Sequence, residues 1–133
     1  MDCTGSMGSW IERSKNTLKG IIQSVKTDYE NLNVKVSFVG YRDVQDKNRF
    51  DVFEFSEDLD AVTKFIAKMS ANGGGDAPED VQGGLNQALN MKWTPSSIKQ
   101  LFLICDAPGH GKDICDSHDN HPKGSPDGFK IQD

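Results

Sequence analysis

The sequence has no long hydrophobic run and no excess of basic residues. No apolar stretch approaches the roughly 18 residues of a membrane-spanning helix, so we expect a soluble chain without membrane insertion. Lysine and arginine number 15 against 20 aspartates and glutamates, which gives a formal net charge of −5. A nucleic-acid-binding surface needs clustered cations to neutralise phosphates. The charge balance therefore excludes nucleic acid as the expected partner and favours cationic ones.

The sequence is also poor in cysteine and lacks the features of a signal peptide. Cys3, Cys105 and Cys115 are odd in number and irregularly spaced, which does not indicate a disulfide framework. No charged and apolar leader is present at the start of the sequence. Both observations favour a cytoplasmic setting. A length of 133 residues fits one domain, residues 1–133, with a single core.

Apolar residues recur at helical spacing in three segments, with charged residues between them. The second segment follows Ser56, a good N-cap with acidic residues behind it. The third starts with Ala77-Pro78-Glu79-Asp80, where proline suits the first turn of a helix. The sequence therefore predicts helices over residues 10–31, 57–69 and 77–91.

Three further segments have the character of strands. Val34–Tyr41 alternates and then becomes apolar, and the short linkage to Phe50–Phe55 predicts an antiparallel hairpin. Gln100–Cys105 is a continuous apolar run that is too short for a helix, and it predicts a central parallel strand. Residues 107–133, rich in turn-forming residues, are expected to be a loop-rich tail.

The order of these elements predicts an α/β fold. We expect an open, doubly wound, mostly parallel sheet of the Rossmann-like kind, with one antiparallel edge hairpin and helices on both faces. Such sheets bind ligands at the carboxyl ends of their strands. No apolar run precedes Asp2, so we expect an incomplete domain: the central strand before Asp2 is missing or supplied from elsewhere, and a C-terminal helix and strand are lacking.

Oxygen-bearing side chains gather at two of these expected strand ends. Asp2, Thr4 and Ser6 place one carboxylate and two hydroxyls on a tight turn before the first helix. Asp106 follows the strand at residues 100–105, at the same edge of the predicted sheet. Mg²⁺ prefers oxygen ligands in near-octahedral geometry and retains several waters. These residues are therefore candidates for holding one hard cation.

The motifs resemble the von Willebrand factor type A domain with its metal-ion-dependent adhesion site. That family has Asp-x-Ser/Thr-x-Ser in a first loop, Thr or Asp in a glycine-rich second loop, and Asp after the fourth strand. Asp2, Thr4 and Ser6 match the first part, Asp106 matches the last, and Asp76 in Gly-Gly-Gly-Asp-Ala-Pro-Glu takes the second-loop place. Val-Gly-Tyr-Arg-Asp and Asp-Ala-Pro-Gly-His-Gly make the chain most similar to the branch attached to alpha-type protein kinases.

The resemblance implies a function as well as a fold. Asp2, Thr4, Ser6, Asp76 and Asp106 would organise Mg²⁺ or Mn²⁺, the two hydroxyls directly and the aspartates directly or through water. A partner protein would supply a carboxylate to the ion's open position. The implied role is a metal-dependent protein-interaction module without catalytic activity of its own, which a larger protein kinase could contain.

Simple helix capping is an alternative interpretation of the same residues. The Thr4 and Ser6 hydroxyls could accept hydrogen bonds from free N–H groups of the first helix. Asp76 and Glu79 have the spacing of a capping box. A cap and a metal ligand are not exclusive, so both interpretations stay open.

Two other functions compete with the binding module. The loop Asp-Cys-Thr-Gly-Ser is also similar to the Asp-Lys-Thr-Gly-Thr loop of aspartyl-phosphate pumps and their phosphatase relatives, which would make Asp2 the nucleophile of a Mg²⁺-dependent enzyme. Cys3 stands where that lysine would be. Alternatively, the α-amine beside Asp2 would disfavour a cation and leave a silent structural scaffold.

The tail contains a second set of candidate metal ligands. His110, Cys115, His118 and His121 offer nitrogen and sulfur donors, the last three in the order Cys-x-x-His-x-x-His. Zinc accepts such ligands in tetrahedral sites. The spacing matches no common zinc finger, so zinc is a subsidiary hypothesis.

Overall fold

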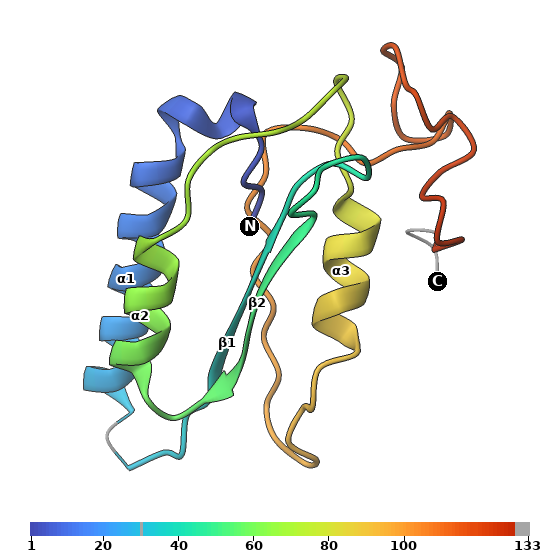
Figure 1. The fold of residues 1–133 in the computed structure, drawn as a ribbon. Helices are drawn as coiled ribbons and strands as arrows, with labels where there is room; N and C mark the ends of the chain where they lie inside the picture. The colour runs from blue at the N-terminus through green and yellow to red at the C-terminus, as the bar shows by residue number, and fades with distance from the viewer. Residues whose placement is uncertain (30, 130–133) are drawn as a thin grey trace.

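The computed structural model describes residues 1–29 and 31–129 (Figure 1). The last four residues of the predicted tail lie outside the described residues. None of the described helices is long and apolar enough to cross a membrane. The elements are a 3₁₀ helix η1 (Gly5–Ser9), α1 (Ile11–Asp28), β1 (Val36–Tyr41), β2 (Phe50–Ser56), α2 (Leu59–Ala67) and α3 (Val81–Leu89).

Strands β1 and β2 form the predicted antiparallel hairpin. Phe38 pairs with Phe53 and Tyr41 with Phe50, and the register shifts between Val36 and Phe38. Aromatic and β-branched side chains at these positions suit a pleated surface that is partly covered. The hairpin prediction is thereby confirmed.

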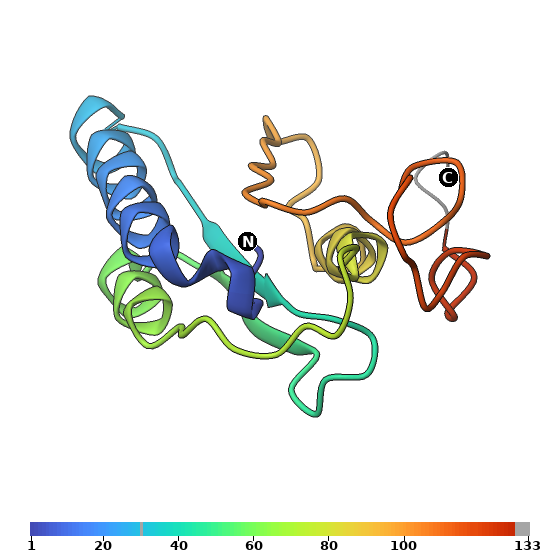
Figure 2. The ribbon, with the colours of Figure 1, turned by 90° about the horizontal axis from the view of Figure 1, so that it is seen from above.

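Helices cover both faces of the hairpin. Figures 1 and 2 show α1 and α2 together on one side and α3 on the other. Phe65 of α2 contacts the rings of Phe38 and Phe53, with centroids 6.0 and 5.1 Å apart, so α2 packs directly on the strands. Val62 and Ile66 of the same helix are fully buried in this core. The α/β organisation expected from the sequence is present.

Helix α3 lies unusually close to β1 because of a glycine. A Cβ atom at Gly84 would lie 2.6 Å from Cδ1 of the buried Tyr41, a distance that real Cβ atoms essentially never show. Glycine therefore lets the helix backbone rest against the tyrosine ring, and this contact fixes α3 against the end of β1.

Two predicted helix starts were wrong by a few residues. The α2 N-cap is Asp58, which accepts a hydrogen bond from the Ala61 N–H at 2.9 Å, whereas Ser56 ends β2. The α3 N-cap is Asp80, which accepts from the Gly83 N–H at 3.0 Å, so residues 77–80 precede the helix. Several acidic residues in a row offer alternative caps, and sequence spacing does not choose between them.

The first three residues lie between β1 and the segment that ends at Ile104. The Tyr41 N–H donates to the Met1 carbonyl at 3.0 Å, and the Cys3 N–H donates to the Tyr41 carbonyl at 2.9 Å. On the other side, the Asp2 N–H donates to the Ile104 carbonyl at 2.8 Å. Asp2 and Tyr41 form a parallel bridge. These few bonds have the arrangement of a short central parallel strand.

The prediction of a strand over residues 100–105 was wrong for this structure. The described chain has only the two-stranded β1–β2 sheet, and a doubly wound parallel sheet is not seen. Leu101, Phe102 and Leu103 are 46, 59 and 45% exposed. A strand needs a continuous hydrogen-bonded neighbour, and here the backbone pairing reaches only Asp2.

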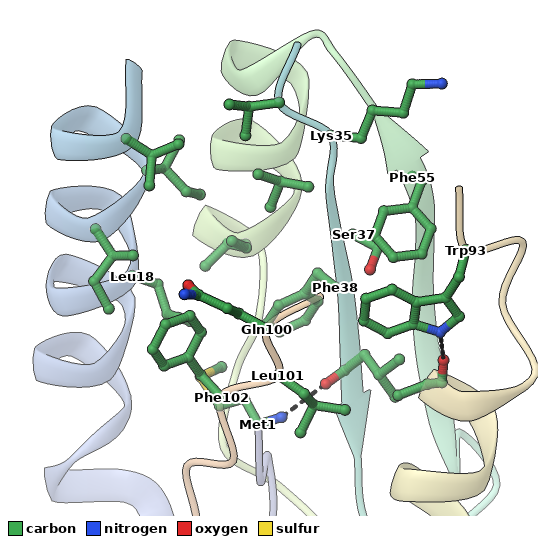
Figure 3. A pocket seen from close by; sticks show the side chains of 18 of the residues that line it. Met1, Leu18, Lys35, Ser37, Phe38, Phe55, Trp93, Gln100, Leu101 and Phe102 are labelled. Carbon is green, nitrogen blue, oxygen red and sulfur yellow. Dashed lines mark hydrogen bonds between the residues drawn. The ribbon is translucent and has the colours of Figure 1, made fainter. Parts of the chain in front are cut away.

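An apolar cavity of about 670 Å³ separates this segment from β1. Leu18 of α1, Phe38 of β1, and Leu101 and Phe102 line it together with Met1 (Figure 3).

The buried side of α2 should dominate the stability of the core. We expect Ile66→Ala to lower the free energy of unfolding by about 2–5 kcal/mol, because the substitution removes buried methyl groups and leaves a cavity in a packed interior. Urea unfolding followed by circular dichroism measures the change.

The matched control is Leu89→Ala on α3. Leu89 is 67% exposed, so its truncation should change the free energy of unfolding by no more than about 0.5 kcal/mol. Equal losses for the two variants would contradict the packing described here.

Candidate metal centre

The turn at the start of the chain is closed by the Asp2 carboxylate. Both the Thr4 N–H and the Thr4 hydroxyl donate to Asp2 Oδ1, at 2.8 and 2.7 Å. Thr4 occupies the N-cap position of η1, but its side chain makes no capping hydrogen bond. The helix-cap interpretation was therefore wrong for the Thr4 side chain, which is directed to Asp2 instead.

Ser6 and Asp106 join this turn from opposite ends of the sequence. The Ser6 hydroxyl donates to Asp106 Oδ1 at 2.8 Å, and its oxygen lies 3.2 Å from the Thr4 hydroxyl. The hydrogen bond between Asp2 and Ile104 places Asp106 two residues beyond the paired position. The structure thus brings together four of the predicted ligands: Asp2, Thr4, Ser6 and Asp106.

The group has a buried floor and an exposed rim. Asp2 and Thr4 are fully buried, whereas Ser6 and Asp106 are exposed. Burial raises the pKa of Asp2, the hydrogen bonds from Thr4 oppose that shift, and the charge of Asp106 adds to it. The second oxygen of Asp2, Oδ2, is buried without a hydrogen-bond partner. An unpaired buried carboxylate oxygen is costly, and a cation is one group that would satisfy it.

Glu79 is a further acidic residue of the site that the sequence reasoning did not assign as a ligand. It is only 3% exposed, and its Oε2 is buried without a partner. A Cβ atom at Gly74, where φ is +83°, would lie 2.9 Å from Glu79 Oε1 and 3.6 Å from Thr4 Cβ. Glycine at this position therefore leaves room for the Glu79 carboxylate beside Thr4.

Burial raises the pKa of Glu79 to about 8, and the charges of Asp2, Asp43 and Asp46 add to the shift. The only sequence pattern that included Glu79 was its capping-box spacing from Asp76. Because Asp80 caps α3, the capping-box interpretation was wrong, and the Glu79 side chain is turned toward the other carboxylates.

Asp76 lies in a different neighbourhood from the other four predicted ligands. Its Oδ2 accepts a hydrogen bond from the Asn120 N–H at 2.6 Å. Its carboxylate also lies within 4.8 Å of ligand atoms of Asp43 and His110. Among the hydrogen bonds of the described residues, none joins Asp76 to Asp2, Thr4, Ser6 or Asp106.

His110 is buried between two carboxylates. Its Nε2 lies 2.7 Å from Asp43 Oδ1, and its Nδ1 lies 2.8 Å from Asp119 Oδ1. Burial alone would lower the pKa of His110, but the hydrogen bonds to Asp43 and Asp119 outweigh it and raise the pKa. Backbone N–H groups of Gly111 and His121 also donate to Asp119, which anchors the loop after Asp106.

The four tail residues considered for zinc do not form one ligand group in the described part of the chain. Cys115 Sγ lies 3.1 Å from the Ser117 hydroxyl, and His118 lies 3.2 Å from the Asn120 side-chain oxygen. His110 instead joins Asp43 and Asp76. Regular spacing of residues in a loop does not bring their side chains to one point, because the hydrogen bonds of the loop set the path of its backbone.

The donor set around Asp2 suits a hard cation. Carboxylate and hydroxyl oxygens are the ligands that Mg²⁺ and Mn²⁺ prefer, and the group contains no nitrogen or sulfur donor among its four members. In comparison with known protein families, the von Willebrand factor A domain model matches residues 1–120. The chain belongs to the von Willebrand factor A domain family.

Two curated relatives extend the comparison. The chain is 36% identical over 134 residues to "Alpha-protein kinase vwkA" of Dictyostelium discoideum, covering 100% of this chain and 21% of the relative. It is 30% identical over 112 residues to "Putative ariadne-like RING finger protein R811" of Acanthamoeba polyphaga mimivirus, covering 84% of this chain and 11% of the relative. The chain thus spans 21% of the length of the first relative and 11% of the length of the second. No solved structure matches it.

Glu79 should make the protein less stable as the pH rises. The folded state retains a proton on this carboxyl up to a pKa of about 8, whereas an ordinary glutamate releases it near 4.5. Its contribution is fully present below pH 4.5 and is lost as the pH rises through about 8. Glu79→Gln should therefore gain stability relative to the parent as the pH rises, in thermal unfolding between pH 5 and 9.

Glu57→Gln is the control for this pH series. Glu57 is exposed and lies 3.7 Å from Lys35, so its replacement should leave the pH dependence close to that of the parent. A Glu79→Gln variant whose stability changes with pH as the parent's does would contradict the assignment.

Proposed function

We propose that this chain is a metal-dependent protein-interaction module. Asp2, Thr4, Ser6 and Asp106 would hold one Mg²⁺ or Mn²⁺, and a carboxylate of a partner protein would complete its coordination. The observation that carries the proposal is the hydrogen-bonded convergence of these four side chains from both ends of the sequence. Glu79 is the nearby carboxylate that could take part directly or through water.

Two features of the group support a cation. Asp2 Oδ2 and Glu79 Oε2 are buried without partners, so the folded chain already bears the cost of desolvating oxygens that a cation would satisfy. The Ser6 hydroxyl hydrogen bond to Asp106 also keeps two donor oxygens 2.8 Å apart at the rim. A divalent ion supplies at this place a centre of positive charge for an acidic group to bind.

The exposure of the rim supports a partner of matching chemistry. Because Ser6 and Asp106 are exposed while Asp2 and Thr4 are buried, a ligand can approach from the rim only. A partner carboxylate fits the open position of an oxygen-coordinated Mg²⁺, which otherwise retains water. Protein interaction is the general role of the family, and the acidic partner group is our specific proposal.

The proposed role for this segment is recognition and not catalysis. Asp2 is fully buried, and its Oδ1 already accepts two hydrogen bonds from Thr4. An aspartyl-phosphate mechanism would require this carboxylate to reach a phosphoryl group, which the observed geometry disfavours. Kinase activity is named for a relative of which the chain covers 21%, and we do not extend it to this segment.

Asp106→Ala should weaken the binding of Mg²⁺ and Mn²⁺. Calorimetric titration of the parent should show saturable binding to one site, and the variant should bind at least tenfold more weakly because the exposed carboxylate ligand is gone. Circular dichroism of both proteins verifies that they are folded.

Asp60→Ala provides the matched control, because Asp60 is an exposed aspartate of α2 that lies 3.6 Å from Lys26. It should bind the ions like the parent. A folded parent that takes up neither ion, or an Asp106→Ala protein with parental affinity, would overturn the metal site.

The partner chemistry can be tested separately. A short peptide containing glutamate should bind the parent in Mg²⁺ and lose binding when the metal is chelated, whereas its glutamine counterpart should not bind in either condition. Equal binding of the two peptides would refute the carboxylate while leaving the metal site intact.

A further inference from the structure

A second group of candidate metal ligands lies outside the site at Asp2. Asp43, Asp76 and His110 each place one ligand atom within 4.8 Å of the other two. They come from three separate parts of the chain: the residue pair after β1, the glycine-rich loop, and the loop that follows Asp106. Such convergence requires three loops to be held at one point, and spacing in the sequence does not indicate it.

The distances within the group suit coordination of one ion. His110 Nε2 and Asp43 Oδ1 are 2.7 Å apart. Two ligands bound at about 2.1 Å to the same zinc ion lie roughly 3 to 3.5 Å from each other. To admit a metal between them, the two side chains would need to separate slightly and to release the proton that His110 Nε2 and Asp43 Oδ1 now share.

The second nitrogen of His110 is held as metal-binding histidines are usually held. Its Nδ1 faces Asp119 Oδ1 at 2.8 Å, and Asp119 is fixed by the backbone N–H groups of Gly111 and His121. A ligating histidine nearly always donates its other N–H to a carboxylate or a carbonyl, which fixes the ring and leaves one lone pair for the ion. The Asp119–His110 pair therefore has the form of a supporting carboxylate and its ligand.

The third member carries an oxygen that nothing in the described chain satisfies. Asp76 Oδ2 accepts from the Asn120 N–H, but Asp76 Oδ1 is buried without a hydrogen-bond partner. His121 Nε2 is likewise buried without a partner, and its ring centroid lies 4.9 Å from that of His110. A metal ion would satisfy both the unpartnered nitrogen and the unpartnered oxygen next to the group.

We propose that Asp43, Asp76 and His110 form a second metal site, for a transition-metal ion of the Zn²⁺ or Co²⁺ type. Mixed imidazole and carboxylate ligands favour such ions over Mg²⁺. Asp119 orients His110 in this site and is a positioning residue. Its ligands differ from those of the proposed oxygen-only site, which are Asp2, Thr4, Ser6 and Asp106.

Titration with Co²⁺ tests the proposal on the full chain. The experiment uses the Asp106→Ala protein, in which the first site is removed, and follows the visible absorption of bound Co²⁺ and its displacement by Zn²⁺. We expect one equivalent to bind. Asp76→Asn in the same background should weaken binding at least tenfold, and Asp119→Asn should weaken it by roughly 10–100-fold, as removal of a supporting carboxylate does elsewhere.

His118→Gln is the control, since His118 is an exposed histidine of the same loop whose side chain contacts Asn120. It should leave Co²⁺ binding unchanged. A separate measurement of Mg²⁺ affinity in the Asp76→Asn variant, with Asp106 intact, shows whether the two sites bind independently. Failure of one proposal can therefore be distinguished from failure of the other. Circular dichroism of each variant identifies any loss of folding.

Two results would overturn the second site. One is the absence of saturable Co²⁺ binding by the folded protein, which would leave His110 as a structural link between Asp43 and Asp119. The other is binding that Asp76→Asn does not weaken or that His118→Gln weakens equally, which would place the ion elsewhere in the loop.

Discussion

The site depends on a few backbone hydrogen bonds at the start of the chain. Met1, Asp2 and Cys3 pair with Tyr41 on one side and with Ile104 on the other. This arrangement brings the first loop and the loop after Ile104 to one edge. Ligands bind at the carboxyl ends of parallel strands for the same geometric reason, because the loops that follow the strands meet there. The contacts between Ser6 and Asp106, and between Thr4 and Asp2, follow from it. The hydrophobic core beneath, built by α1, α2 and β1, supports this pairing.

The loops around this edge hold several carboxylates near one another, where their negative charges repel. Each is stabilised in a different way: Asp2 by Thr4, Asp80 by Arg49 at 2.6 Å and by the first turn of α3, and Asp119 by backbone N–H groups. Glu79 has no such partner for Oε2 and shows the largest rise in carboxyl pKa. A carboxyl group whose pKa is strongly raised by burial and by neighbouring charges is typical of functional sites.

Much of the local structure could be predicted from the sequence, and the parts that failed share a cause. Periodicity located the three α-helices and the hairpin of the described residues, because each buries its own apolar face. The segment 100–105 was predicted as a strand from its apolar run, but strand formation depends on a neighbour that composition cannot supply. The motifs predicted Asp2, Thr4, Ser6, Asp76 and Asp106 as one group, and hydrogen bonds link all of these except Asp76. The motifs could not show that Glu79 turns inward while Asp76 faces His110, because those directions are set by the glycine loop and the distant 107–121 loop.

The buried floor and exposed rim of the site affect the order in which a metal ion and an acidic partner would bind. The acidic residues at this edge, in a chain with a formal net charge of −5, produce a negative potential that attracts cations and repels an acidic partner. A partner carboxylate would therefore meet repulsion until an ion has bound, and attraction afterwards. Association with an acidic protein would then depend on the local concentration of divalent ions.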